Sequence, residues 1–138
     1  MPITLVDTGP LVAYLGGDDR EHDWALAVFD SLPSPLLTCE AVITETCFLM
    51  LRRFKSCDLV LQMVDRGVIE IRFSLAIERA RIRNLMQRYS DTPMSLADAC
   101  LVRMSELLPD SRVLTMDSDF SVYRRHGRQA IPLLTPFA

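Results

Sequence analysis

The 138-residue sequence lacks the features of membrane and secreted proteins. No apolar run approaches the roughly 18 residues that a helix needs to cross a bilayer. The first residues, Met1 to Asp7, have no basic segment ahead of a long apolar one, as a signal peptide would. With 49% hydrophobic and 24% charged residues, the composition is that of an ordinary globular domain. We therefore expect a cytoplasmic protein that forms a single domain over residues 1–138.

Zinc ligands and an excess of positive charge are also missing. The two histidines are isolated and the four cysteines form no CxxC pair, so buried free thiols are expected rather than a zinc site. The net charge of −3 argues against a generic basic nucleic-acid coat. Three local basic clusters are present: Arg52, Arg53 and Lys55; Arg79, Arg81, Arg83 and Arg88; and Arg124, Arg125, His126 and Arg128.

These clusters differ in what they predict. The first two are compatible with solvated helix faces. The third follows an acidic turn, so it is the best candidate for contact with phosphate groups of a nucleic acid, through Arg124, Arg125 and Arg128.

Apolar patterns typical of strands alternate along the chain with patterns typical of helices. Strands are expected over residues 3–6, 36–38, 68–73, 112–116 and 130–134, and helices or helical turns over residues 11–15, 21–31, 40–53, 56–66, 75–89, 95–108 and 120–125. Such alternation predicts an α/β fold with a mainly parallel sheet that helices cover on both faces.

Two of the expected strands run directly into aspartates. Asp7 follows the first strand, and Asp117 and Asp119 follow the strand over 112–116. Ligands of α/β proteins bind outside the carboxyl ends of the strands, which is where these acids fall. Each aspartate alone is more typical of a turn or a helix cap than of a binding site. The functional interpretation therefore rests on the position that these aspartates share, at the carboxyl ends of the strands.

Two further acids interrupt apolar helical segments. Glu45 has no basic residue three or four positions away, so a buried Glu45 would take up a proton unless a cation neutralised it. Asp98 follows Ser95 by three residues, as in a capping box, and the first turn of a helix also suits a cation ligand. Carboxylates that converge in one cleft repel each other unless a divalent ion is present, and all-oxygen ligands indicate Mg²⁺ or Mn²⁺. The acids therefore predict metal-assisted hydrolysis of phosphodiesters.

Four segments in order resemble the PIN-domain ribonucleases, and among them the VapC-like toxins of type II toxin–antitoxin systems. They are Val6-Asp7-Thr8-Gly9-Pro10-Leu11, Val42-Ile43-Thr44-Glu45-Thr46-Cys47, Leu96-Ala97-Asp98-Ala99 and Leu114-Thr115-Met116-Asp117-Ser118-Asp119-Phe120. The resemblance implies a three-layer α/β/α sandwich. It also implies Mg²⁺- or Mn²⁺-dependent endonucleolytic cleavage of RNA.

The resemblance further implies residue roles and partners. Catalysis and metal binding would fall to Asp7, Glu45, Asp98 and Asp117, with Asp119 as an auxiliary metal ligand and Thr115 as polar support. The partners would be the RNA substrate, a small antitoxin protein and a second copy of the chain, with no membrane involved.

Three alternatives remain open. The chain could be an RNA-processing PIN nuclease without an antitoxin, or a non-catalytic RNA- or protein-binding module of the same fold. A phosphatase or phosphoacceptor is disfavoured, because Gly9 stands two residues after Asp7, where many such phosphatases have a second aspartate. A receiver-like phosphoacceptor domain would need a lysine near the site. The only lysine here, Lys55, lies at a helix boundary rather than near a strand end.

Overall fold

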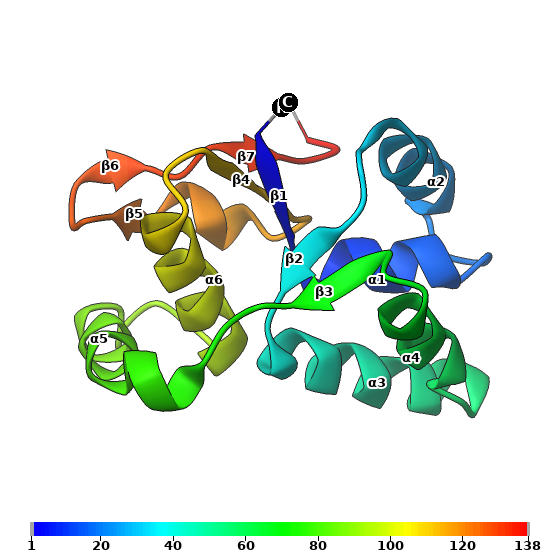
Figure 1. Cartoon of the computed structure of the whole chain (residues 1–138), viewed down its shortest axis with the longest axis horizontal. Coiled ribbons are helices and arrows are strands. Elements are labelled where there is room, and N and C mark those ends of the chain that lie inside the picture. The colour runs from blue at the N-terminus through cyan, green and yellow to red at the C-terminus, as the bar shows by residue number, and fades with distance from the viewer. Residues whose placement is uncertain (1, 138) are drawn as a thin grey trace.

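A five-stranded parallel sheet forms the centre of the protein (Figure 1). The structure is a computed structural model that describes residues 2–137. The sheet contains β1 (Ile3–Val6), β2 (Leu36–Thr38), β3 (Ile69–Ile71), β4 (Ser111–Leu114) and β7 (Leu133–Leu134), in the order β3-β2-β1-β4-β7. A separate antiparallel pair consists of β5 (Arg124–Arg125) and β6 (Gln129–Ala130). The α/β class with a mainly parallel sheet, predicted from the alternating pattern, is confirmed.

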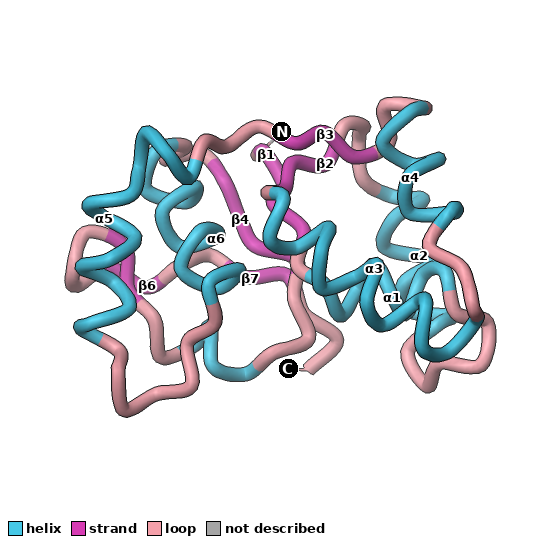
Figure 2. Tube along the Cα trace, turned by 90° about the horizontal axis from the view of Figure 1, so that it is seen from below, coloured by secondary structure: helices cyan, strands magenta, loops and turns pink. Residues whose placement is uncertain are grey.

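Helices flank the strands on both sides. They are α1 (Thr8–Leu15), α2 (His22–Ser31), α3 (Glu40–Phe54), α4 (Asp58–Asp65), α5 (Leu75–Arg88) and α6 (Leu96–Leu107), with a 3₁₀-helix, η1, over Ser118–Ser121. Figures 1 and 2 both place α5 and α6 on one side of the strands and α1 to α4 on the other. Among these described helices, none combines the length and apolar character that a bilayer crossing requires.

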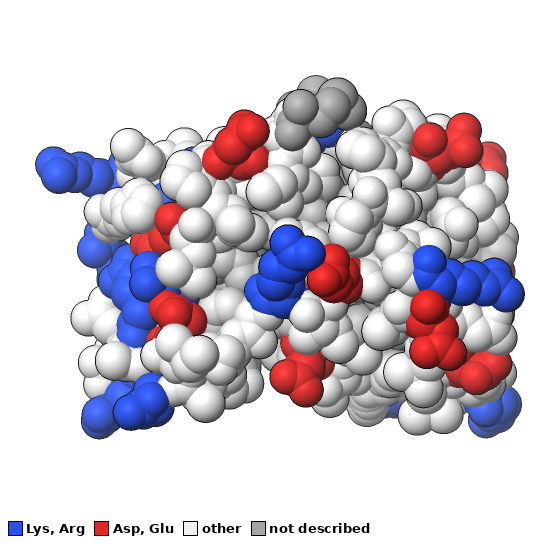
Figure 3. Space-filling view, in the orientation of Figure 1, with Lys and Arg blue, Asp and Glu red and all other residues white. Residues whose placement is uncertain are grey.

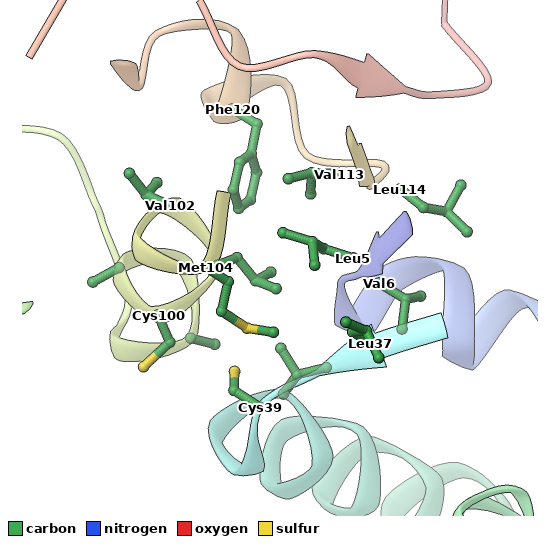
Figure 4. Close-up of a cluster of buried hydrophobic side chains, with 14 of the residues drawn as sticks. Leu5, Val6, Leu37, Cys39, Cys100, Val102, Met104, Val113, Leu114 and Phe120 are labelled. Atoms are coloured by element: carbon green, nitrogen blue, oxygen red, sulfur yellow. The ribbon is translucent and has the colours of Figure 1, made fainter. Parts of the chain in front are cut away.

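Strand β1 is the centre of the hydrophobic core. It pairs in parallel with β2 on one side and β4 on the other, so that Leu5 lies beside Leu37 and Val113. A strand buried on both faces is mainly apolar, which explains why the buried Leu5 and Val6 lead directly into Asp7. Figure 4 shows the side chains of β1 packed among those of the neighbouring strands, α6 and Phe120.

The four cysteines are free thiols. Cys39 and Cys100 are buried in the core, as expected, and lie near each other in Figure 4. Cys47 and Cys57 are only partly buried.

Helix α1 begins earlier than the sequence pattern suggests. We expected it to start at Leu11, but it starts at Thr8, directly after β1. The Oδ1 atom of Asp7 accepts a hydrogen bond from the backbone N–H of Thr8 at 2.8 Å, which caps the helix. Pro10 is tolerated in the first turn, where its missing N–H has no helical partner in any case. Asp7 is thus fixed between a buried strand and a helix.

The C-terminal segment also differs from the expected pattern. The helical turn lies at Ser118–Ser121 rather than 120–125, and Arg124–Arg125 forms a strand. The expected strand over 130–134 divides into β6 and β7, which join different sheets. Pro132 lies between them, and its missing N–H prevents continuous pairing.

Arg125 anchors this segment to the end of α6. It is 8% exposed, and its Nη2 atom donates to the carbonyl oxygens of Ser105 at 2.8 Å and Pro109 at 3.2 Å. Backbone carbonyls at a helix C-terminus carry partial negative charge and lack helical donors, so a guanidinium group satisfies both needs.

Replacing Arg125 with Met should therefore destabilise the protein, while the same change at the exposed Arg128 should not. We expect Arg125→Met to lower the free energy of unfolding by about 2–3 kcal/mol, because buried carbonyl groups lose a charged donor. Arg128→Met should stay within about 0.5 kcal/mol of the wild type. Urea unfolding followed by circular dichroism measures both, and equal midpoints for the two variants would contradict this role of Arg125.

Candidate active site

The carboxyl ends of β1 and β4 form the base of the site. Val6 pairs with Leu114, so the next residues along each strand, Asp7 and Thr115, are neighbours, and the backbone N–H of Asp7 donates to the carbonyl of Leu114 at 3.0 Å. The chain passes from β1 to β2 and β3 on one side and later returns to β4 on the other. The crevice at such a change of direction is where α/β sheets bind ligands.

Asp7 is a buried carboxylate at the bottom of this crevice. It is 6% exposed, and Thr115 donates its hydroxyl to Oδ2 at 2.8 Å while Thr8 binds Oδ1. Burial raises the pKa of Asp7 to about 6, although these two hydrogen bonds lower it. The charges of Asp98 and Asp117 raise it further by smaller amounts. Asp7 therefore lies in an environment that favours an added positive charge.

Asp117 and Asp119 have different positions in the turn after β4. The backbone N–H of Asp117 donates to the Thr115 hydroxyl at 3.0 Å, and Oδ1 of Asp117 accepts from the backbone N–H of Asp119 at 2.9 Å. Asp117 lines the pocket described below, whereas Asp119 does not. Of the two acids that compete for this turn, Asp117 is the one that faces the crevice.

Asp98 enters the site from the first turn of α6. Its backbone N–H donates to the Ser95 hydroxyl at 3.0 Å, and its Oδ2 accepts from the Ser95 backbone at 3.1 Å, which completes the capping box expected from the sequence. Burial raises the pKa of Asp98, while the bonds from Ser95 and Tyr123 lower it. Within residues 2–137, Oδ1 of Asp98 accepts no hydrogen bond, so this atom is available to a ligand.

Tyr123 is a site residue that the sequence did not reveal. Its hydroxyl donates to Oδ2 of Asp98 at 3.1 Å, and its side chain is fully buried. Burial, followed by the nearby charge of Asp98, raises the pKa of Tyr123, so it remains a proton donor. A lone tyrosine 25 positions after an aspartate gives no sequence signal, because only the fold brings the two together.

Glu45 lies at the site for a different reason from the one that the sequence suggested. We argued that Glu45 interrupts an apolar helix and would be buried, but its side chain is exposed on α3. The carboxylate accepts a hydrogen bond from the Thr8 hydroxyl at 3.2 Å. The apolar residues three and four positions later on the same face of α3, Phe48 and Leu49, are exposed as well. The apolar sequence around Glu45 therefore did not indicate burial, and the argument from uncompensated burial was wrong.

The four acids meet around one pocket of about 560 Å³. It is lined by Asp7, Thr8, Gly9, Glu45, Pro93, Ser95, Asp98, Met116, Asp117 and Ser118. The acids come from four separate parts of the chain, and the oxygen atoms of their carboxylates suit hard divalent cations. However, no three His, Cys, Asp or Glu side chains in residues 2–137 are close enough to hold an ion together.

Gly9 fits the pocket wall closely. A Cβ atom at this position would lie 3.3 Å from Cβ of Met116, which also lines the pocket. The position that holds a second aspartate in many phosphatases is therefore occupied here by a residue that allows α1 to pack closely against the turn after β4.

The arginines proposed from the sequence for phosphate contact do not line this pocket. Arg125 is buried against backbone carbonyls, so the expectation that it contacts RNA was wrong. Arg124 donates to the carbonyls of Ser121 and Tyr123 beside η1, and Arg128 is exposed.

The raised pKa of Asp7 leads to a prediction about stability. Because the folded state binds this proton more tightly than the unfolded chain, stability is lost as the pH rises from about 4 through about 6. A shift of roughly two pKa units corresponds to at most about 3 kcal/mol. Asp7→Asn should therefore raise Tm at pH 7 in EDTA, and this gain should vanish near pH 4.

The exposed Asp65 on α4 provides the control, since Asp65→Asn should leave Tm nearly unchanged at both pH values. Scanning calorimetry of the three proteins measures the effect. A gain for Asp7→Asn that is the same at pH 4 and pH 7 would show that desolvation of the charge is not its cause.

Comparisons with known proteins agree with the architecture. The solved structure of VapC20 from Mycobacterium tuberculosis, described as a sarcin–ricin loop cleaving toxin, matches with a TM-score of 0.76. The alignment covers 94% of this chain and 99% of that chain at 21% identity, and it supports the fold. A search of curated proteins finds no match. A family model described as PIN domain matches residues 4–125, a span that includes all four pocket acids. The protein is a member of the PIN-domain family.

Proposed function

We propose that this protein is a divalent-metal-dependent endoribonuclease and the toxin of a toxin–antitoxin pair. The observation that carries this proposal is the meeting of Asp7, Glu45, Asp98 and Asp117 around one pocket in a PIN-domain chain. The likeness to a toxin that cleaves the sarcin–ricin loop supports RNA as the substrate. The family match also supports our interpretation of residues 1–138 as one nuclease domain.

The donor set fits Mg²⁺ or Mn²⁺ better than zinc. Mg²⁺ usually keeps several of its waters and takes one or two carboxylates, so it does not require three protein ligands in contact. Asp7 and Asp98 are the strongest candidates for direct ligands, because both are largely buried and each has a raised pKa that a cation would lower. Glu45 and Asp117 would complete the negative pocket, with Asp119 as an auxiliary acid outside it.

The surrounding side chains hold these carboxylates in place. Thr115 fixes the orientation of Asp7, Thr8 that of Glu45, and Ser95 and Tyr123 that of Asp98. These carboxylates would hold a divalent ion, which would supply positive charge to the phosphate oxygens and make a bound water more acidic. The protein contributes a rigid set of acceptors, so little reorganisation is needed during the reaction.

Cleavage of RNA should depend on both the metal and the acids. We expect cleavage of total cellular RNA with Mn²⁺ or Mg²⁺ and none in excess EDTA, with recovery when the ion is restored. Asp98→Asn should lower kcat/KM by about a hundredfold or more, because even indirect partners of a metal contribute 10- to 100-fold. Asp65→Asn, a matched change on the surface of α4, should retain full activity.

Mapping the cut sites by sequencing of RNA ends completes this test and identifies the target. Cleavage that persists in excess chelator, or that Asp98→Asn performs as well as the wild type, would contradict the metal-dependent mechanism.

The toxin role has a separate test. We expect induction of the wild-type protein to arrest growth of a bacterial host, and Asp98→Asn to permit normal growth at the same expression level. Equal growth of the two strains would favour an RNA-processing nuclease without an antitoxin, and would leave the nuclease proposal intact. A cytoplasmic location, a small antitoxin partner and a homodimer belong to this part of the proposal.

A further inference from the structure

We propose that a second pocket, formed by arginines next to the acidic one, binds phosphate groups of the RNA backbone. This inference rests on the proposed action on RNA and adds a binding site to it. The pocket has a volume of about 350 Å³ and is lined by Arg81, Arg88, Arg103, Glu106, His126 and Gly127. It joins two basic clusters that are about 40 residues apart in the sequence.

A buried carboxylate organises the arginines. The side chain of Glu106 is 1% exposed, and its Oε1 accepts from Nε of Arg81 at 3.0 Å and from Nη1 of Arg103 at 3.2 Å. Its Oε2 accepts from Nη2 of Arg81 at 2.7 Å and from the backbone N–H of His126 at 2.6 Å. Burial opposes ionisation, but these bonds outweigh it and lower the pKa of Glu106 to about 2. Glu106 is thus a charged anchor that fixes two guanidinium groups.

Arg88 supplies a positive charge that no carboxylate offsets within the described residues. Its Nη2 donates to the carbonyl oxygen of Gly127 at 2.8 Å, and its guanidinium group lies 5.8 Å from the ring centroid of Tyr89. A Cβ atom at Gly127 would lie 3.3 Å from Nη1 of Arg88, and Gly127 has a φ of 81°. Glycine therefore both permits the turn and leaves Arg88 accessible from the pocket.

The balance of charge in the pocket is positive. Three arginines line the pocket together with Glu106, and the neighbouring Glu78 accepts from Nε of Arg103 at 2.6 Å. Guanidinium groups bind phosphates through paired, charge-assisted hydrogen bonds. A pocket in which Glu106 and Glu78 hold two arginines in place, and a third arginine remains without an acid, suits a phosphate.

Positive and negative charges are also distributed unevenly along the chain. Residues 79–138 contain nine arginines and six acids, a net charge of +3, whereas residues 1–78 contain six basic and twelve acidic residues, a net charge of −6. Figure 3 shows Lys and Arg side chains gathered at the left, where Figure 1 places α5, β5 and β6. An overall negative protein therefore presents a basic end to a nucleic acid.

The arginine pocket and the acidic pocket have different lining residues, but helix α6 contributes to both. Helix α6 carries Asp98 in its first turn and Arg103 and Glu106 five and eight residues later, which is about 8–12 Å along the helix axis. Tyr123, which binds Asp98, packs edge-on against Tyr89 at 5.1 Å between ring centroids, and Arg88 lies over Tyr89. Phosphates recur every few ångströms along a nucleic-acid strand, so one RNA can occupy both pockets.

Binding of a fluorescein-labelled 20-nucleotide RNA, measured by anisotropy in EDTA, tests the proposal. At 100 mM salt, we expect Arg88→Gln and Arg103→Gln each to raise Kd about three- to tenfold. Each should also reduce the slope of log K against log salt by about 0.7, the value for one lost phosphate contact on a single strand. Arg66→Gln makes the same charge change at the residue that follows α4, at the other end of the molecule, and should leave both quantities unchanged.

Thermal melting of each variant shows whether it folds. Should Arg88→Gln fail to fold, Arg88→Lys, which keeps the charge without the planar fork, should still weaken binding. Wild-type affinity for RNA in both Arg88→Gln and Arg103→Gln would overturn the proposal. The proposal would also be overturned if the two variants lost binding to labelled polyglutamate but kept their affinity for RNA. The pocket would then bind an acidic protein segment.

Cleavage with Mn²⁺ is assayed separately on the same variants. RNA binding that follows the expected pattern without any cleavage by the wild type would refute the nuclease function and leave the arginine site standing. Conversely, the wild type could cleave RNA while Arg88→Gln and Arg103→Gln leave RNA binding unchanged. This result would refute the arginine site and leave the nuclease function standing.

Discussion

The hydrogen bond from the Thr115 hydroxyl to Asp7 joins the ends of two adjacent parallel strands, and the rest of the site depends on it. It forms because the register of β1 and β4 places these residues side by side. The same hydroxyl accepts a hydrogen bond from the backbone N–H of Asp117 and so positions the turn that follows β4. Thr115 thus positions two of the four acids, Asp7 and Asp117. Helices α3 and α6 then bring Glu45 and Asp98 to the same crevice.

The strand ends were predictable from sequence because their signal is local. A buried parallel strand is a short apolar run, and an acid directly after it must lie at the carboxyl edge of the sheet. Asp7, Asp117 and the capping box of Asp98 follow from such local rules, as does the α/β class. The family prediction, which rested on the order of four short segments, is confirmed by the match over residues 4–125.

The failures of prediction concern positions that tertiary packing decides. Sequence alone gave Glu45 and Arg125 the wrong environments, since Glu45 is exposed and Arg125 is buried. Helical periodicity was too weak to show which face of α3 packs on the core. Only the fold shows that β5 presents Arg125 to the last carbonyls of α6, or that Tyr123 reaches Asp98. Contacts between distant segments leave no pattern in a single sequence.

The burial of Asp7 also has a consequence for how long the molecule survives in a cell. An interior carboxylate that ionises near neutral pH shifts the folding equilibrium towards the open chain, which is what proteases degrade. Any cationic partner that binds only the folded form reverses this shift by mass action. A cation that binds in the crevice would therefore also raise the free energy of unfolding, so binding at this site would be linked to the folding of the chain.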